Sequence, residues 1–589
     1  MSAIQQLLMD HLDIWTAADT GKKSGRGRSL SNAASVYGIR KLRELILELA
    51  VRGKLVPQDP LDEPACELLK RILDEKANLI LEGKIKKGKL PPISDVEKPF
   101  ELPLGWEWVH LPVICDYKVG KTPSTKSSVY WTNSDDGYNW VSIADLNHDG
   151  LVLETTKHIT ANAVAEVFKC DPAPSGTILM SFKLTLGKVS ILDKPAFHNE
   201  AIISIYPNQS IFKDFLFKML PARAMAGNSK SAIKGNTLNS ESIAALLIPL
   251  APLAEQHRIV AKVDELMALC DQMETQHNNA TEAHEKLVNH LLGTLTQSQS
   301  AEEFTENWQR IATHFDTLFT TETSIEALKQ TLLQLAVMGK LVPQDQNDEP
   351  ANELLKRIQA EKAKLVLEGK IKKFKPLPLV TDQDKPFELP PSWKWSHIGD
   401  VAKSTDYGLS EKTFEITCGV PVLKMGDIQN GKVILGGQKR LDKEVNDLPE
   451  LYLKNGDILY NRTNSEELVG KTGIYEGPDG EYTFASYLIR IRCVDGLFSP
   501  RFLNLAMNTP LFRKTQIVPH LKQQCGQANV NGTIMKNMII PVPSFEEQNL
   551  ICEKIDELIA LCDQLKVRIT KINQLQRKLA DVVVAHVGI

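Results

Sequence analysis

The stretch LAVRGKLVPQD, Leu49–Asp59, returns as LAVMGKLVPQD at Leu335–Asp345. Three further pieces, ELLKRI, LEGKIKK and KPFELP, follow both copies in the same order. They lie at Glu67–Ile72 and Glu353–Ile358, Leu81–Lys87 and Leu367–Lys373, and Lys98–Pro103 and Lys385–Pro390. A Trp-x-Trp comes shortly after each KPFELP. The chain therefore contains one long unit that is used twice.

A second repeated block lies downstream of each first one. AEQHRIVAKVDELMALCDQ, Ala254–Gln272, matches EEQNLICEKIDELIALCDQ, Glu546–Gln564. Between the blocks the likeness weakens to short pieces, such as GTIL at Gly176–Leu179 and GDIL at Gly456–Leu459. A period this long indicates a duplicated domain and not a solenoid of short repeats. A constant frame around two diverging middles indicates a fixed scaffold that presents two different binding surfaces.

The composition of the 589 residues predicts a folded, cytoplasmic protein of several domains. No stretch approaches the roughly 18 consecutive apolar residues of a membrane helix. The first residues, MSAIQQLLMDHLDIW, include acids and no basic leader. Nine cysteines without a CxxC pair favour reduced thiols over disulfides, and no metal site is expected.

The net charge of −4 does not indicate nucleic-acid binding, but the charges are unevenly distributed. Seven basic side chains and one acid lie between Ala485 and Ile540, and five basic and two acidic side chains lie between Ala201 and Leu250. Basic surface of this kind neutralises phosphates. An ordinary solvated face has the same composition, so charge alone leaves both interpretations open.

The helix that starts each second block has apolar residues at alternating spacings of four and three, the seam of a coiled coil. Each helix of roughly 40 residues measures about 60 Å. We expect the two seams to cover each other and the helices to dock partner proteins, although packing on the helix's own domain is the simpler alternative. The predicted seam and docking residues are Ile259, Val263, Leu266, Cys270, Ile551, Ile555, Leu558 and Cys562.

Two further helices are predicted before each middle. The first pair covers Tyr37–Val51 and Ser324–Val337, each ending near a glycine. The second pair covers Pro64–Leu81 and Pro350–Leu367, with proline in the first turn. Residues 1–36 stand outside the repeat in this interpretation, and their basic stretch 21–32 is either a tether or an electrostatic arm.

The middles show short apolar runs broken by glycine, asparagine and aspartate, which predicts mixed, strand-rich globules. Polar and basic residues follow directly after two of the expected strands. Arginine and lysine match the guanine edge, and asparagine matches adenine, so such loops can read bases; ordinary surface turns have the same residues. The DNA-binding candidates are Lys183, Lys188, Lys234, Asn461, Arg462, Asn464, Lys471, Arg490 and Lys522.

Motifs of catalysis are missing. The two GKT tripeptides, Gly120–Thr122 and Gly470–Thr472, lack the upstream glycine of a phosphate loop, because Cys115 and Ser465 stand there. DPAP at Asp171–Pro174 lacks the aromatic residue that stacks on a flipped adenine. These absences predict a reader of DNA that carries no chemistry of its own.

Two variable middles framed by near-identical helices resemble the specificity (S) subunit of type I restriction–modification systems. The resemblance is carried by LAVxGKLVPQ in both copies, IPLAPLAEQHRIV at Ile248–Val260 and GDILYNRTN at Gly456–Asn464. It covers nearly the whole chain beyond residue 36.

The resemblance implies an α+β fold with an internal pseudo-two-fold repeat, in which two target-recognition domains are joined by long antiparallel coiled-coil helices. The expected parts are an N-terminal extension 1–36, helices 37–97, recognition domain 98–250, central helix 251–298, helices 299–384, recognition domain 385–543 and C-terminal helix 544–589.

The resemblance also implies a function in bacterial defence. Each domain would read one half of a split site on double-stranded DNA, and the helices would set the gap and dock two methyltransferase (M) subunits. S-adenosylmethionine, ATP and Mg²⁺ are expected on the M subunits and on two restriction (R) subunits, with no cofactor in this chain. A coiled-coil scaffold without DNA specificity and a self-sufficient methyltransferase or nuclease are the alternatives.

Overall fold

The computed structural model describes residues 12–17, 36–82 and 92–588, apart from 135, 148, 184, 227–229, 233–234, 238–239, 374, 442–447 and 525–526. The chain forms two compact units. Unit 1 contains Met1–Ala280 together with Ile572–Ile589, and unit 2 contains Thr281–Lys571. Each unit holds one copy of the repeat, and each long helix contributes its last turns to the other copy's unit.

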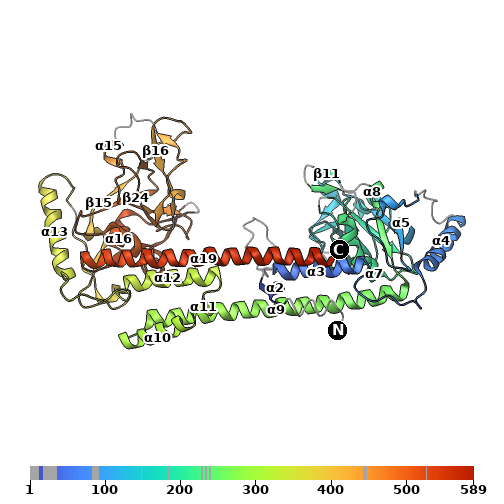
Figure 1. Ribbon diagram of the computed structural model, residues 1–589. Coiled ribbons are helices and arrows are strands. Elements are labelled where there is room, and N and C mark those ends of the chain that lie inside the picture. The colour runs from blue at the N-terminus through green and yellow to red at the C-terminus, as the bar shows by residue number, and fades with distance from the viewer. Residues whose placement is uncertain are drawn as a thin grey trace. The chain divides into compact units, whose positions relative to one another are not determined.

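In unit 1 the predicted helix Tyr37–Val51 is confirmed as α3, and it lies along the first half of α9, Leu253–Gln297 (Figure 1). An Arg43 guanidinium nitrogen lies 2.7 Å from both Asp271 and Glu274 of α9. The two helices share one apolar core, to which α9 contributes Ile259, Val263, Leu266, Cys270 and Met273.

Unit 2 repeats this pairing with α12, Glu322–Val337, and α19, Phe545–Gly588. Lys329 forms an ion pair with Asp563, and the Thr570 hydroxyl donates to Glu322 over 2.7 Å. Lys329 and Asp563 hold the positions of Arg43 and Asp271 in the repeat. The first halves of both seams are thus covered by the short helix of their own repeat, which corrects the expectation that the two seams cover each other.

The short helix α2, Leu12–Ala17, packs on α3 and buries Trp15. The contact is close, because a Cβ on Gly38 would lie 2.3 Å from the Trp15 carbonyl oxygen. In unit 2 the helix α11, Phe315–Leu318, precedes α12 and buries Leu318. HLDIW at 11–15 matches HFDTL at 314–318, so residues 12–17 correspond to part of repeat 2. The basic stretch 21–32 lies outside the described residues.

The second predicted helix pair begins one residue later than expected. These helices are α4, Ala65–Leu81, and α13, Ala351–Leu367, and Pro64 and Pro350 are their N-caps with extended backbone. At these starts the Ala65 and Ala351 N–H groups donate to the backbone carbonyls of Gly105 and Ser392, in the first residues of each middle, over 2.8 and 3.0 Å.

Both middles are strand-rich and share one sheet order in spite of their different sequences. Unit 1 has a five-stranded sheet ordered β2 (Cys115–Val119), β10 (Ile202–Pro207), β7 (Ile178–Ser181), β8 (Val189–Leu192) and β5 (Gly150–Val152). Unit 2 has a six-stranded sheet ordered β15 (Ala402–Tyr407), β24 (Leu488–Cys493), β20 (Ile458–Asn461), β22 (Thr472–Ile474), β18 (Lys432–Val433) and β17 (Ile428–Gln429). In both sheets the first three neighbouring pairs are antiparallel and the fourth is parallel.

A second, smaller sheet accompanies each of these. In unit 1 it is ordered β3 (Trp131–Thr132), β6 (Lys157–Ile159), β4 (Tyr138–Val141) and β9 (Phe197–His198). In unit 2 it is ordered β19 (Arg440–Leu441), β16 (Val420–Leu423) and β23 (Thr483–Phe484). The parallel pair β4–β9 corresponds to the parallel pair β16–β23.

A polar contact fastens each middle to its frame. The Trp106 indole N–H donates to Glu255, at the start of α9, over 2.9 Å, and the Gln58 amide donates to the same carboxylate over 3.0 Å. Trp393 and Gln344 contact Glu547 of α19 in the same way. Burial raises the pKa of both carboxyl groups. The repeated stretch and the second repeated block are thus kept alike by contact with each other.

Candidate nucleic-acid interface

Two equivalent hairpins carry most of the predicted DNA-binding residues. One joins β7 to β8 across residues 182–188, and the other joins β20 to β22 across residues 462–471. The Ser181 N–H donates to Lys188 over 2.9 Å, and the Asn461 N–H donates to Lys471 over the same distance. Because these bonds match, Ser181 and Asn461 hold equivalent positions in the two domains.

The glycines before these lysines close the hairpins. The Gly187 N–H donates to the Ser181 carbonyl over 2.9 Å, and the Gly470 N–H donates to Asn461 over 2.7 Å. Both glycines have positive φ, 70° and 88°, which other residues rarely adopt. The GKT at Gly470–Thr472 is therefore a hairpin closure, not a phosphate loop.

The unit 1 candidates are partly placed. Lys183 is half-buried, with its ammonium 5.3 Å from the centre of the Phe182 ring. Lys188 is also half-buried, and burial lowers the pKa of its ammonium group, which donates to the Ile143 carbonyl over 3.4 Å. Lys234 lies outside the described residues, between β11 (Lys230–Ala232) and β12 (Gly235–Thr237).

In unit 2 a three-stranded sheet gathers candidates that are distant in the sequence. Its order is β21 (Thr463–Asn464), β26 (Gln527–Asn529) and β25 (Lys522–Gln524). Asn529 pairs with Thr463 on one side and with Lys522 on the other. Asn464 and Lys522 therefore lie on one small sheet next to Arg462, while Lys471 is exposed at the end of the hairpin.

Four neighbouring polar atoms in this region are buried and have no hydrogen-bond partner within the described residues. They are Asn461 Oδ1, Arg462 Nε, Thr463 Oγ1 and Asn529 Oδ1. The Arg462 guanidinium lies 5.0 Å from the centre of the Tyr407 ring, and the Tyr407 hydroxyl accepts a hydrogen bond from the Gly532 N–H over 2.8 Å. Tyr407 and Asn529 were not singled out from the sequence, because only the fold brings them to this hairpin.

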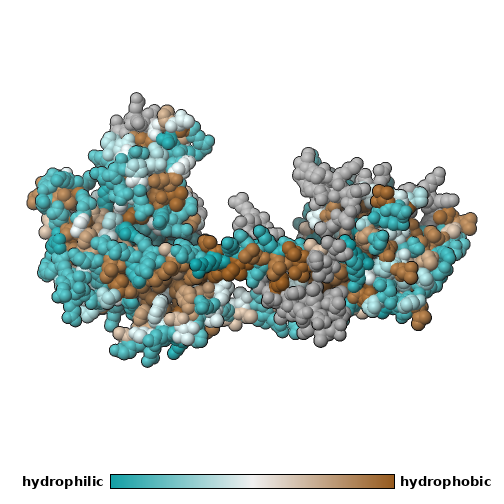
Figure 2. Space-filling model, in the orientation of Figure 1, coloured by the Kyte–Doolittle hydropathy of each residue, from teal (hydrophilic) through white to brown (hydrophobic). Residues whose placement is uncertain are grey.

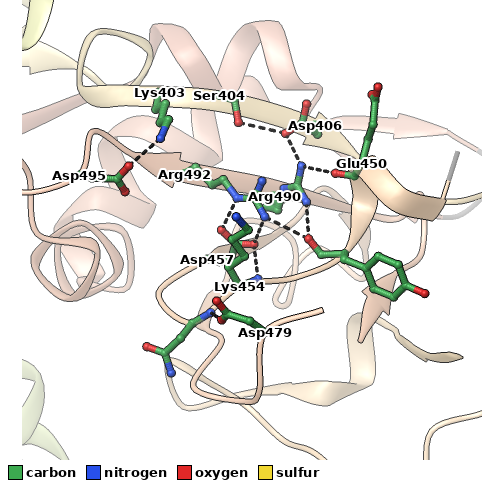
Figure 3. Close-up of polar contacts among 12 residues, drawn as sticks. Lys403, Ser404, Asp406, Glu450, Lys454, Asp457, Asp479, Arg490, Arg492 and Asp495 are labelled. Atoms are coloured by element: carbon green, nitrogen blue, oxygen red, sulfur yellow. Dashed lines mark hydrogen bonds and ion pairs between the residues drawn. The ribbon is translucent and has the colours of Figure 1, made fainter. Parts of the chain in front are cut away.

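The prediction for Arg490 is wrong. Its two terminal guanidinium nitrogens are engaged inside the domain, where one donates to Asp406 over 2.8 Å (Figure 3) and the other to the Tyr452 carbonyl over 2.9 Å. The side chain is 3% exposed. Next to it, Arg492 makes two bonds to Asp457 of 2.7 and 2.9 Å (Figure 3). These arginines hold the loop before β20 against the sheet, and the buried Arg490 is unavailable to DNA.

The predicted docking residues of the seams are covered within the chain. Seven of them are buried and Leu558 is half-buried. A different stripe of α19 is exposed: Ile572, Leu575, Leu579 and Val582 are between 47% and 61% exposed, and apolar side chains show along this helix in Figure 2. Their spacings of three and four give one helix face.

No group of three or more histidine, cysteine, aspartate or glutamate side chains in the described part could hold a metal ion. No described helix is long and apolar enough to cross a membrane.

Comparison with known proteins gives a family. A model of the "Type I restriction modification DNA specificity domain" matches residues 103–283 and 390–577, each a middle together with most of its long helix. The EcoEI specificity subunit of Escherichia coli is 38% identical over 602 residues, which cover 98% of each chain. The EcoAI specificity subunit of Escherichia coli is 37% identical over 600 residues, with the same coverage.

A solved structure, the HsdS subunit from Thermoanaerobacter tengcongensis, is 17% identical and has a TM-score of 0.38, covering 83% of this chain and 98% of that one. The assignment therefore rests on the family model and on the two Escherichia coli relatives, which match nearly from end to end. The chain belongs to the family of type I restriction–modification specificity subunits, the DNA-recognition components of these systems.

Proposed function

We propose that each strand-rich domain reads one half of a split site on double-stranded DNA, and that the 181–188 and 461–471 hairpins supply base-reading groups. One observation carries this proposal: the same hairpin, closed by the same backbone bonds, holds different side chains in the two units. Phe182 stands at the position of Arg462, and Lys183 at that of Thr463. Hairpins that close alike but differ in length and in side chains suit two different half-sites.

The frame suits a complex with partner proteins. The repeated helices present two similar surfaces, so two identical methyltransferase subunits can dock on them in the same way. The exposed apolar stripe of α19 from Ile572 to Val582 is a surface that a second helix can cover. That helix belongs either to this chain, as an antiparallel coiled coil, or to a docked subunit.

The chemistry is assigned to those partners. We place S-adenosylmethionine and adenine methylation on the methyltransferase subunits, and ATP and Mg²⁺ on methyltransferase-associated restriction subunits that cleave unmodified DNA. This chain supplies recognition and spacing and catalyses nothing. A complex that acts on cellular and incoming DNA works in the bacterial cytoplasm.

A domain exchange tests the proposal. Residues 98–250 are replaced by the first middle of another specificity subunit, and the chain is assembled with its methyltransferase subunits. Sequencing of methylated adenines in a randomised DNA pool gives the motif before and after the exchange. We expect one half of the motif to change while the other half and the gap stay the same.

The reciprocal exchange of residues 385–543 is the matched control, and it should change only the other half. A change in both halves after either exchange, or in neither, contradicts modular reading. A complex without any sequence preference would favour the scaffold alternative.

A further inference from the structure

We propose that Arg462 reads a guanine of the half-site bound by unit 2, and that Tyr407 positions its guanidinium group. This inference rests on the proposed function and adds a base and a residue to it. It assigns roles to side chains of this chain that the family comparison does not assign.

The backbone of Arg462 is fixed on two sides. Its N–H donates to the Tyr487 carbonyl over 3.1 Å, and its carbonyl accepts from the Val530 N–H over 2.9 Å. It directly follows Asn461, the last residue of β20 in the central sheet. A base-reading side chain needs such a fixed backbone position, because groups next to regular elements are held more accurately than groups on loops.

The guanidinium of Arg462 has no acceptor within the described residues. It lies over the face of Tyr407, and its Nε is buried without a hydrogen-bond partner in the described part. Other arginines of the domain differ in this respect: Arg492 meets a carboxylate, and Arg513 donates to the Val469 carbonyl over 2.8 Å. A fixed guanidinium without an acceptor indicates that a ligand supplies one.

The chemistry favours a base edge over a phosphate. Arginine pairs through two hydrogen bonds with O6 and N7 of guanine, and this pairing needs the planar head to be held in one orientation. Stacking on an aromatic face gives that orientation.

Unit 1 cannot read guanine from the same position. The structurally equivalent residue is Phe182, which is 2% exposed and has no side-chain donor. Guanine reading at this hairpin position therefore belongs to one half-site only, which gives the inference an internal control.

The test uses the full chain assembled with its methyltransferase subunits and the randomised DNA pool, read by sequencing of methylated adenine. We expect Arg462→Ala to reduce discrimination at one guanine of one half-site by about 5- to 150-fold, the range of a lost bidentate contact. Arg462→Gln, which keeps a polar side chain, should shift that position towards adenine, because glutamine matches the adenine edge.

Two further variants test the positioning role. Tyr407→Phe keeps the ring and should retain the guanine preference, whereas Tyr407→Leu removes the ring and should weaken the preference at the same base pair. Lys439→Ala, a surface cation of the same domain that pairs with Glu415 over 2.9 Å, is the control and should leave every base preference unchanged.

The outcomes separate the two proposals. A wild-type complex without a split motif overturns the proposed function. A split motif that keeps its guanine preference in Arg462→Ala and Arg462→Gln overturns only the Arg462 assignment. A uniform loss of methylation over all sequences also overturns it, because phosphate contacts weaken binding without changing specificity.

Discussion

The one difference between the two copies of the repeated stretch, Arg52 against Met338, belongs to a change in its surroundings. The Arg52 Nε lies 2.6 Å from Glu48, and its guanidinium is 5.0 Å from the centre of the Phe100 ring. In unit 2 the position of Glu48 is held by Gln334, whose amide has no partner within the described residues. Gln334 lines a cavity of about 20 Å³. The charged pair Glu48–Arg52 of one copy is thus replaced by the uncharged Gln334 and Met338 in the other.

The Trp-x-Trp of each repeat gives a residue-scale prediction. Trp106→Phe removes a hydrogen bond to the buried carboxylate of Glu255, and we expect a loss of about 2 kcal/mol in the free energy of unfolding. Trp393→Phe should cost the same in unit 2, because it removes the matching 2.8 Å bond to Glu547. Urea unfolding of the full chain measures both effects.

Trp108→Phe is the matched control. Its indole N–H donates to a neutral backbone carbonyl, that of Phe100, over 3.3 Å, so its removal should cost less, about 1 kcal/mol. If Trp108→Phe destabilised the protein as much as Trp106→Phe, the contact with Glu255 would not be what fastens the middle to α9.

For the helices and strands, the sequence predicted the positions of elements with strong local patterns. It did not predict which elements pack against each other. Tyr37–Val51 is confirmed because apolar periodicity and a terminal glycine are local signals. The seam of α9 showed that a partner helix exists, but periodicity cannot say which helix, and α3 takes the place expected for α19.

The same reason explains which features of the DNA-binding candidates the sequence predicted and which it did not. Asn461 and Arg462 could be placed after a strand from the sequence alone. The pairing of β21 with β26, and the bonds of Arg490 to the Asp406 carboxylate and to backbone carbonyls, depend on contacts between distant segments. Burial of an arginine in such a domain is decided by those contacts, which a basic residue in the sequence does not reveal.

The small sheet of unit 1 predicts a pH dependence. Burial lowers the pKa of His198, on β9, from 6.5 to about 4. The unfolded state therefore binds a proton at a higher pH than the folded state does. Above about pH 6.5 the free energy of unfolding is unaffected by this histidine, and it decreases as the pH falls towards 4. The loss should reach about 3 kcal/mol, from 1.36 kcal/mol per pKa unit.

Denaturant unfolding between pH 7 and pH 4 measures this loss. His198→Gln should flatten the dependence in that window, whereas His158→Gln, half-exposed on strand β6 of the same sheet, should leave it unchanged. An unchanged slope in His198→Gln would assign the dependence to other groups.

At the scale of the whole molecule, the two units are joined by exchanged helix ends. Residues 572–588 of α19 belong to unit 1, where Ala580 is fully buried in the core around α3. The Tyr37 hydroxyl donates to Asp581 over 2.7 Å. In unit 2 the end of α9 takes the same part, with Val288, Leu292 and Leu295 in the core. The stability of each unit therefore depends on a helix that begins in the other.

A chain that ends at Lys571 tests this dependence. It lacks the α19 turns that unit 1 buries, so unit 1 should lose about 3 kcal/mol, from the lost apolar burial and the Tyr37 hydrogen bond. Calorimetry of the full and shortened chains should show one transition lowered by about 5 °C or more and the other unchanged. Tyr37→Phe removes the hydrogen bond alone and should lower the same transition by less. Equal shifts of both transitions would mean that α19 stabilises the two units as one body, and the units would then not read their half-sites as separately folded modules.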